Sequence, residues 1–192
     1  KLFYLDQNKD VVFFSEIKKI DYKYQENSQN LVESKLNIFN LPIKLKSKHN
    51  IANKVINTEI DLNTLRLKIE NNLKYSEDML DGIVELNYIN KNQKINYNIK
   101  DEKIVLNSID DKFNGEINIK PFFLLLNLNL QNIGVKKIFA NNSILVNFLK
   151  SEIIYNKNLN GKIKVIIDGI NDLNHIDQIT FDILLEEGLI FI

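Results

Sequence analysis

The chain has 192 residues, with 25 basic and 25 acidic side chains and no cysteine. This length suffices for one domain with a sizeable core, because folding removes roughly 70% of the unfolded surface of such a chain from water. The balanced charge argues against a nucleic-acid-binding protein, which normally carries a basic excess, and the lack of cysteine excludes disulfides and thiolate metal sites.

Apolar and polar residues alternate with a period of two along most of the chain. In an extended strand successive side chains point to opposite faces, so this pattern predicts strands with one apolar and one polar face. The pattern occurs in LPIKLKSKH at 41–49, TLRLKIE at 64–70, VELNY at 84–88, INYNI at 95–99, GEINI at 115–119, LLLNLNLQN at 124–132, KIKVII at 162–167 and ITFDILL at 179–185. We therefore expect a mainly β fold of about nine to eleven strands in a curved antiparallel sheet, because buried parallel strands have continuous apolar runs instead.

Turn signals separate these runs. Glycine and asparagine adopt the positive φ that two-residue hairpins need. Turns are predicted at Asp81-Gly82, at 90–92, at Asn114-Gly115 and at Asn160-Gly161.

One segment has helical spacing instead. Its apolar residues are Val135, Ile138, Phe139, Leu145, Phe148, Leu149 and Ile153. This spacing predicts a short amphipathic helix near 135–154, or two helices broken at 141–143, with Asn142 or Ser143 as a cap. We expect this helix to cover one end or one face of the sheet.

Signals for chemistry are few. His49 and His175 lie far apart in loop-like contexts, so we expect exposed histidines and no metal site. The acidic pairs Asp101-Glu102, Asp110-Asp111 and Glu186-Glu187 suit turns or surfaces, because neighbours in a strand point to opposite faces. The sequence has neither a phosphate-binding glycine loop nor a serine nucleophile elbow. We expect no enzyme activity, no cofactor and no nucleic-acid partner.

The apolar faces of the strands can be buried in three ways. They can pack against a second sheet as a sandwich, or face lipid in a transmembrane barrel, which the helical segment argues against. They can also line an open trough that holds acyl chains. The alternation alone is compatible with both the sandwich and the trough.

A resemblance to a known family favours the trough. The stretch FNGEINIKPFFLLLNLNLQNIGVKKIFANNSILVNFLKSEIIYNKNLNGKIKV, residues 113–165, resembles the C-terminal region of AsmA-family proteins, relatives of TamB and of the repeating β-groove lipid-transfer proteins. It has an NG-containing strand, a PF-led alternating strand, an amphipathic helix, K-S-E-I, an NLNG turn and a closing E-E-G strand. The resemblance covers residues 111–192 as one β-groove unit, and residues 1–110 form an alternating strand region that we expect to continue it.

The resemblance implies a periplasmic portion of a protein anchored in the inner membrane of a Gram-negative envelope. It implies a long, curved, taco-like antiparallel β-groove that binds phospholipid acyl chains and takes part in lipid transport to the outer membrane, or in outer-membrane assembly. Membrane attachment would lie in parts of the parent chain outside this sequence. The family has no catalytic residues to carry over.

The alternating faces also predict which residues line such a groove. The predicted lining consists of Leu65, Leu67, Ile69, Leu126, Leu128, Leu130, Ile163, Val165, Ile167, Phe181 and Ile183. The same residues would serve equally well as an ordinary packed core. The alternative function is therefore a structural β-module without a ligand, a sandwich or solenoid section of a larger surface or envelope protein.

Overall fold

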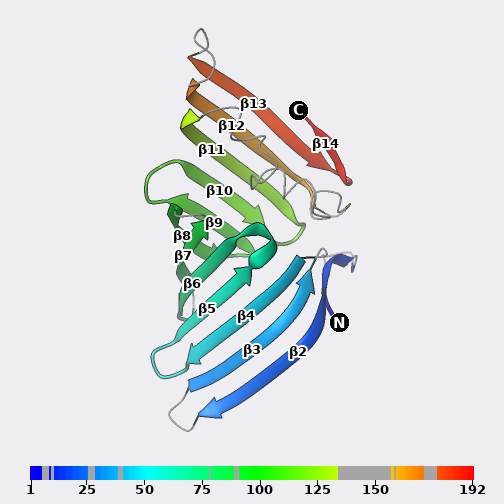
Figure 1. The fold of residues 1–192 in the computed structure, drawn as a ribbon, viewed down its shortest axis with the longest axis vertical. Coiled ribbons are helices and arrows are strands. Elements are labelled where there is room, and N and C mark those ends of the chain that lie inside the picture. The colour runs from blue at the N-terminus through cyan, green and yellow to red at the C-terminus, as the bar shows by residue number, and fades with distance from the viewer. Residues whose placement is uncertain are drawn as a thin grey trace.

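In the computed structural model, the described residues form a single open sheet of fourteen strands that follow one another in chain order (Figure 1). The structure describes residues 1–5, 9, 11–25, 29–38, 41–77, 79–88, 91–133, 157, 159–170 and 177–192. The first seven strands are β1 (Leu2–Leu5), β2 (Val11–Gln25), β3 (Gln29–Ile38), β4 (Leu41–Asn50), β5 (Val55–Leu62), β6 (Leu67–Tyr75) and β7 (Leu80–Tyr88). The others are β8 (Lys91–Lys100), β9 (Lys103–Ser108), β10 (Phe113–Asn118), β11 (Phe123–Ile133), β12 (Gly161–Ile170), β13 (Gln178–Glu186) and β14 (Leu189–Phe191).

The predicted mainly β fold with a curved sheet is confirmed; the sheet is mostly, not entirely, antiparallel, and it has more strands than expected. Strands β1 and β14 have only four and three residues, too few for a clear alternation. In β2 a register shift between Ile17 and Lys19 breaks the alternation, although the strand continues. A bulge of this kind inserts one residue and moves the following side chains to the other face.

One pair of strands departs from the predicted antiparallel arrangement. Strands β11 and β12 are parallel, with Leu128 opposite Val165, whereas every other described pair of neighbours is antiparallel. Parallel neighbours need a long crossover connection, and residues 134–160 are long enough to provide one. The helix predicted near 135–154 falls on this connection and lies outside the described residues.

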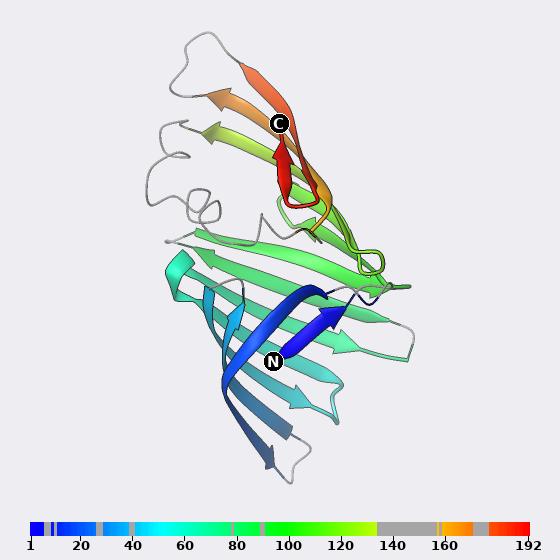
Figure 2. The same ribbon diagram turned by 90° about the vertical axis from the view of Figure 1, so that its right-hand side faces the viewer.

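The sheet is strongly curved. Its two halves, β2–β6 and β9–β14, turn toward each other, and β1 and β14 bend toward the same side (Figures 1 and 2). The Tyr4 hydroxyl on β1 donates a hydrogen bond of 3.1 Å to the carbonyl of Ile119, just after β10. The curvature therefore brings together segments that have eight strands between them in the sheet order.

Three turns were predicted at the wrong places. Gly82 lies inside β7, Gly115 lies inside β10, and Gly161 opens β12. Of the turn predicted at 90–92, Asn90 lies outside the described residues, and Lys91 and Asn92 belong to β8.

Acidic residues occupy several of the turns that the structure does form. Asp101 and Glu102 join β8 to β9 with φ angles of 50° and 60°, and Asp111 has a φ of 57° between β9 and β10. Glu187 and Gly188 join β13 to β14 with φ angles of 52° and 79°. The turn and surface roles predicted for the acidic pairs are confirmed.

Candidate functional site

The strand register gives the sheet one apolar face. Leu45 on β4 lies opposite Ile60 on β5, which lies opposite Ile69 on β6. Opposed residues of neighbouring strands share a face, so these side chains define what we call the inner face. One residue along each strand, Lys46 lies opposite Glu59, and this pair belongs to the outer face.

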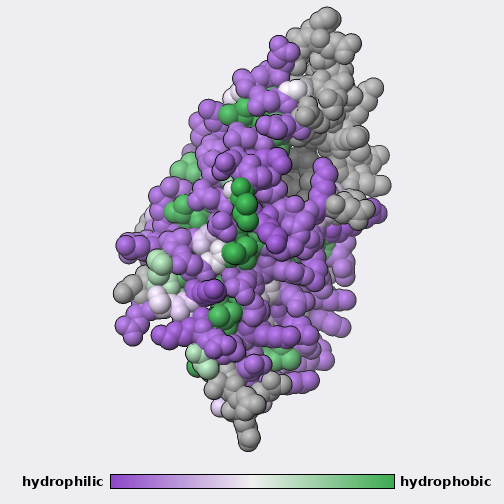
Figure 3. All heavy atoms as spheres, turned by 90° about the vertical axis from the view of Figure 1, so that its left-hand side faces the viewer, coloured by the Kyte–Doolittle hydropathy of each residue, from purple (hydrophilic) through white to green (hydrophobic). Residues whose placement is uncertain are grey.

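The outer face is mostly hydrophilic, as the space-filling view in Figure 3 shows. Cross-strand ion pairs join Lys46 to Glu33 at 3.4 Å, Lys94 to Glu85 at 3.4 Å, Lys103 to Glu116 at 2.6 Å and Lys162 to Asp182 at 2.7 Å. These groups are substantially exposed, so each pair contributes little to stability. They keep this face compatible with water.

All but one of the predicted lining residues lie on the inner face. Those of β11, β12 and β13 come together, because Leu126, Leu128 and Leu130 lie opposite Ile163, Val165 and Ile167 in turn. Ile183 and Phe181 of β13 lie opposite Ile163 and Val165. Leu67 and Ile69 lie on the same face but on β6, with β7–β10 between them and the β11–β13 group.

Leu65 is the exception. It was predicted to begin a strand, but it lies in a short 3-10 turn, Asn63–Leu65, between β5 and β6. Arg66 follows in the left-handed conformation with φ 52°, and the strand starts only at Leu67. The alternation of TLRLKIE runs through this turn without a glycine or proline to mark it. Leu65 is nevertheless buried, with 5% of its surface exposed.

The inner face is only partly covered. Among the described residues six hydrophobic side chains are buried, and no large side chain is fully enclosed. Val165 and Ile167 form the tightest cluster, yet the neighbouring Leu128, Ile163 and Phe181 remain partly exposed. In a sandwich, a second sheet would bury the inward side chains of both sheets. The described strands instead form one layer with an accessible apolar side.

Polar side chains interrupt the inner face on β4–β8, and the prediction from sequence missed them. Ser47 and Thr58 share a hydrogen bond of 3.2 Å between their hydroxyl oxygens. The Tyr97 hydroxyl donates to Asn71 Oδ1 at 2.8 Å. The signal was present in the sequence, because Ser47 and Asn71 occupy apolar positions of the alternation in 41–49 and 67–75.

Tyr97 reaches Asn71 by crossing an intervening strand. Gly82 on β7 lies opposite Tyr97 on β8, and a Cβ atom at Gly82 would be 2.3 Å from the Tyr97 ring. The missing side chain therefore leaves room for the ring to reach β6. Burial raises the pKa of the Tyr97 phenol, so the hydroxyl is protonated at neutral pH and donates.

His49 also differs from expectation. It lies on β4 and not in a loop, is partly buried, and its Nε2 is 2.8 Å from the Tyr75 hydroxyl. His175 lies outside the described residues. Among the residues that the structure describes, no group of three or more histidine, aspartate or glutamate side chains could hold a metal ion.

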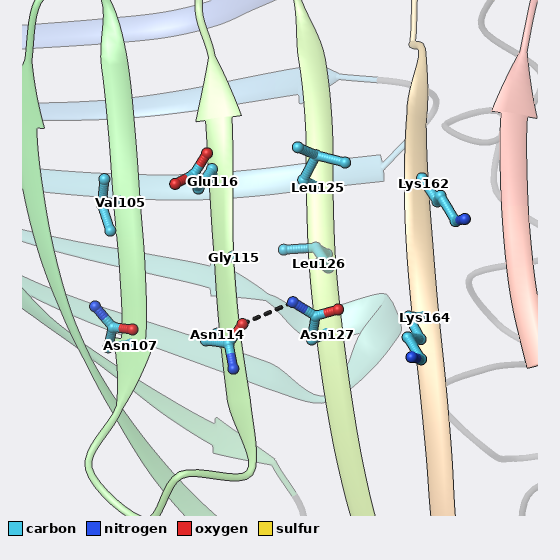
Figure 4. Close-up of a pocket in the computed structure, with 10 residues that line it drawn as sticks. All are labelled: Val105, Asn107, Asn114, Gly115, Glu116, Leu125, Leu126, Asn127, Lys162 and Lys164. Carbon is cyan, nitrogen blue, oxygen red and sulfur yellow. Dashed lines mark hydrogen bonds between the residues drawn. The ribbon is translucent and has the colours of Figure 1, made fainter. Parts of the chain in front are cut away.

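A shallow hollow of about 460 Å³ lies on the outer face over β9–β12 (Figure 4). Asn127 donates to Asn114 Oδ1 at 2.8 Å across it. Its ionic residues are Glu116, Lys162 and Lys164. Glu116, the acid among them, pairs with Lys103, and Lys162 pairs with Asp182. The one acid that lines the hollow therefore already has a basic partner.

Comparison with known proteins gives no family. No protein-family model, no curated protein and no solved structure matches the chain. The resemblance to the AsmA family therefore rests on the sequence pattern of residues 111–192 alone. No helix within the described ranges is long and apolar enough to cross a membrane.

Proposed function

We propose that this chain is a β-groove segment of an AsmA-like protein. Its inner face binds phospholipid acyl chains, and the parent protein takes part in lipid transport to the outer membrane or in outer-membrane assembly. The observation that carries the proposal is the partly exposed apolar inner face, which runs across one open, curved sheet. The periplasmic location and the membrane anchor are supported only by the sequence resemblance.

The energetic argument concerns water at the inner face. Soluble monomers seldom expose apolar patches larger than a few hundred Å² without a partner. An acyl chain placed against the inner face gains about 0.8 kcal/mol for each methylene removed from water. Several methylenes suffice to hold a lipid, and the Leu and Ile side chains of β11–β13 offer such a surface.

The first test is native mass spectrometry of the chain purified without detergent from a Gram-negative host, with lipid extraction alongside. We expect bound phospholipid near stoichiometric amounts. Leu128→Asp places a carboxylate on the inner face, so it should abolish lipid retention. Leu125→Asp is the matched control: Leu125 lies on the same strand, opposite Glu116 on the outer face, and is 39% exposed. Retention should survive this change.

A second measurement avoids placing a charged side chain in the sheet. The chain contains seven tyrosines but no tryptophan, so Leu128→Trp and Leu125→Trp each introduce a single tryptophan that can be excited selectively. Phosphatidylcholine with brominated acyl chains should quench the fluorescence of Trp at position 128 and leave that at position 125 unchanged. Equal quenching at both positions, or none at position 128, would contradict the proposal.

The packed cluster around Val165 and Ile167, 5% and 6% exposed, favours the second candidate, a structural β-module without a ligand. Under that reading the leucines of β11 contact only other side chains of the protein. A lipid-free mass from a cooperatively folded monomer, together with global unfolding of Leu128→Asp, would support it.

A further inference from the structure

A line of polar side chains crosses the inner face of β4, β5 and β6. Ser47 lies opposite Thr58, and Thr58 lies opposite Asn71. The row on one side of this line is apolar, with Leu45, Ile60 and Ile69. The row on the other side has Ile56 and Leu73 next to His49 on β4, whose Nε2 lies 2.8 Å from the Tyr75 hydroxyl. We define the polar row as Ser47, Thr58 and Asn71, together with Tyr97, which reaches over Gly82 to Asn71.

The polar row has unused hydrogen-bond donors. Ser47 and Thr58 share one hydrogen bond, so one of their two hydroxyl protons is left over. The Asn71 carboxamide accepts from Tyr97, and its NH₂ group has no protein partner within the described part of the chain. Ser47, Thr58 and Asn71 are all partly exposed. None of their described side-chain oxygen or nitrogen atoms is both buried and without a hydrogen-bond partner. Their free donors are therefore accessible from the groove.

These hydrogen-bond donors are uncharged, which limits the ligand groups that they can bind. Strands β4–β7, which the structure describes in full, carry no carboxylate, lysine or arginine on the inner face. On β8 the inner face has Lys91, which lies at the opposite end of the inner-face register from Tyr97, across from Tyr88. Phosphate and carboxylate groups are normally bound by Arg or Lys, which supply charge-assisted hydrogen bonds. Neutral O–H and N–H donors in apolar surroundings suit an uncharged acceptor such as a carbonyl oxygen.

Strands β10–β13 supply an apolar partner surface. On β10–β13 all the inner-face side chains that the structure describes are apolar. Strand β6 is four strand spacings from β10, roughly 19 Å along the sheet. A ligand with one carbonyl group at the polar row can therefore extend a hydrocarbon tail toward Leu124 and Leu126 on β11.

We propose that Ser47, Thr58, Asn71 and Tyr97 form a subsite that binds the carbonyl groups of ester-linked acyl chains. This inference rests on the proposed function and makes it more specific. The groove prefers an ester-linked lipid. The ester carbonyl groups of this lipid lie at the polar row, and its charged headgroup lies beyond the polar row. A polar row that only joined the strands would show no such preference, although cross-strand Ser–Thr pairs do stabilise sheets.

The test compares diacyl phosphatidylcholine with its ether-linked dialkyl analogue, which has the same tails and headgroup but no carbonyl. The two lipids are offered to the protein as an equimolar mixture, and their bound ratio is read by native mass spectrometry. A neutral hydrogen bond contributes about 0.5–1.5 kcal/mol, so the wild-type chain should favour the ester lipid by roughly 2- to 10-fold.

Single substitutions test whether the preference for the ester-linked lipid comes from the polar row. Asn71→Leu removes the free NH₂ group and should bring the ratio of bound lipids close to one. Asn72→Leu is the matched control, because the adjacent Asn72 lies on the outer face and donates to Asn57 Oδ1. It should retain the ester preference. Thr58→Val, which keeps the shape of the side chain, provides a second loss variant if Asn71→Leu does not fold.

The outcomes separate this inference from the function on which it rests. Binding of both lipids in equal amounts by the wild-type chain would overturn the carbonyl subsite and leave the groove proposal standing. An ester preference that survives in folded Asn71→Leu and Thr58→Val would also overturn it. Binding of neither lipid would overturn both proposals.

Discussion

Three strand glycines face the inner side of the sheet, where a neighbouring side chain or backbone occupies the space that a Cβ atom would need. At Gly115 a Cβ would lie 2.6 Å from the carbonyl oxygen of Leu125, and at Gly161 it would lie 2.6 Å from that of Leu124. At Gly82 it would meet the Tyr97 ring. Side chains converge on the concave side of a curved sheet, so the smallest residue relieves crowding there.

We predict that Gly115→Ala destabilises the protein. Alanine in a strand is ordinarily favoured over glycine by roughly 0.5–1 kcal/mol. Here the new methyl group meets a backbone oxygen, which cannot move without disturbing the β10–β11 ladder, and such overpacking costs about 1–3 kcal/mol. The expected net result is a lower free energy of unfolding in urea. Asn118→Ala, on the outer face of the same strand, is the control and should change it little. A Gly115→Ala variant as stable as wild type would contradict the close approach.

At the scale of elements, the outer faces of β5, β6 and β7 bring three glutamates into line. Glu59 lies opposite Glu70, and Glu70 lies opposite Glu85. Like charges in directly opposed positions destabilise a sheet. Lys68 offsets this repulsion, because it hydrogen-bonds Glu70 and its ammonium lies 3.9 Å from Glu59. The hydrogen bond to Glu70 raises the pKa of Lys68, so this charge persists across the neutral range.

Lys68→Met should therefore lower the urea midpoint of unfolding. The loss should be largest at low ionic strength and should shrink as sodium chloride is added, because salt screens the glutamate repulsion. Lys162→Met is the comparison, since Lys162 pairs with the single acid Asp182, which also has Lys164 opposite it. Its effect should be smaller. A salt-independent loss for Lys68→Met would instead point to the packing of its hydrocarbon stem.

At the scale of the whole molecule, the described chain is one curved layer and not two packed layers. Most domains bury the apolar face of a sheet against a second layer. Here that face stays partly exposed, and six described hydrophobic residues are buried. Folding therefore removes less surface from water than it does in a compact protein of the same length.

This architecture predicts a shallow dependence of stability on denaturant. The urea m-value scales with the surface exposed on unfolding, so it should be lower than that of a two-layer β-sandwich of similar length. Diacyl phosphatidylcholine should raise the urea midpoint, because a ligand that binds only the folded chain stabilises it by mass action. Both quantities come from equilibrium unfolding followed by circular dichroism. An m-value typical of a compact protein would show that the inner face is covered.

Local features of the structure could be predicted, and long-range features could not. The faces of Leu126, Leu128 and Leu130 follow from the period of two, which every strand has whatever it pairs with. The turn predicted at Asn114-Gly115 was wrong because glycine serves equally in a turn and beneath a neighbouring side chain. Only the position of Leu126 on the next strand distinguishes the two uses.

By itself the sequence determined that this chain forms strands with one apolar and one polar face, because that pattern depends only on adjacent residues. The tertiary structure decided three further things: the parallel pairing of β11 and β12, the single open layer, and the alignment of Ser47, Thr58 and Asn71 across three strands. Each of these depends on register and curvature, which arise from contacts between segments distant along the chain. The polar row is therefore visible only when the strands are placed side by side.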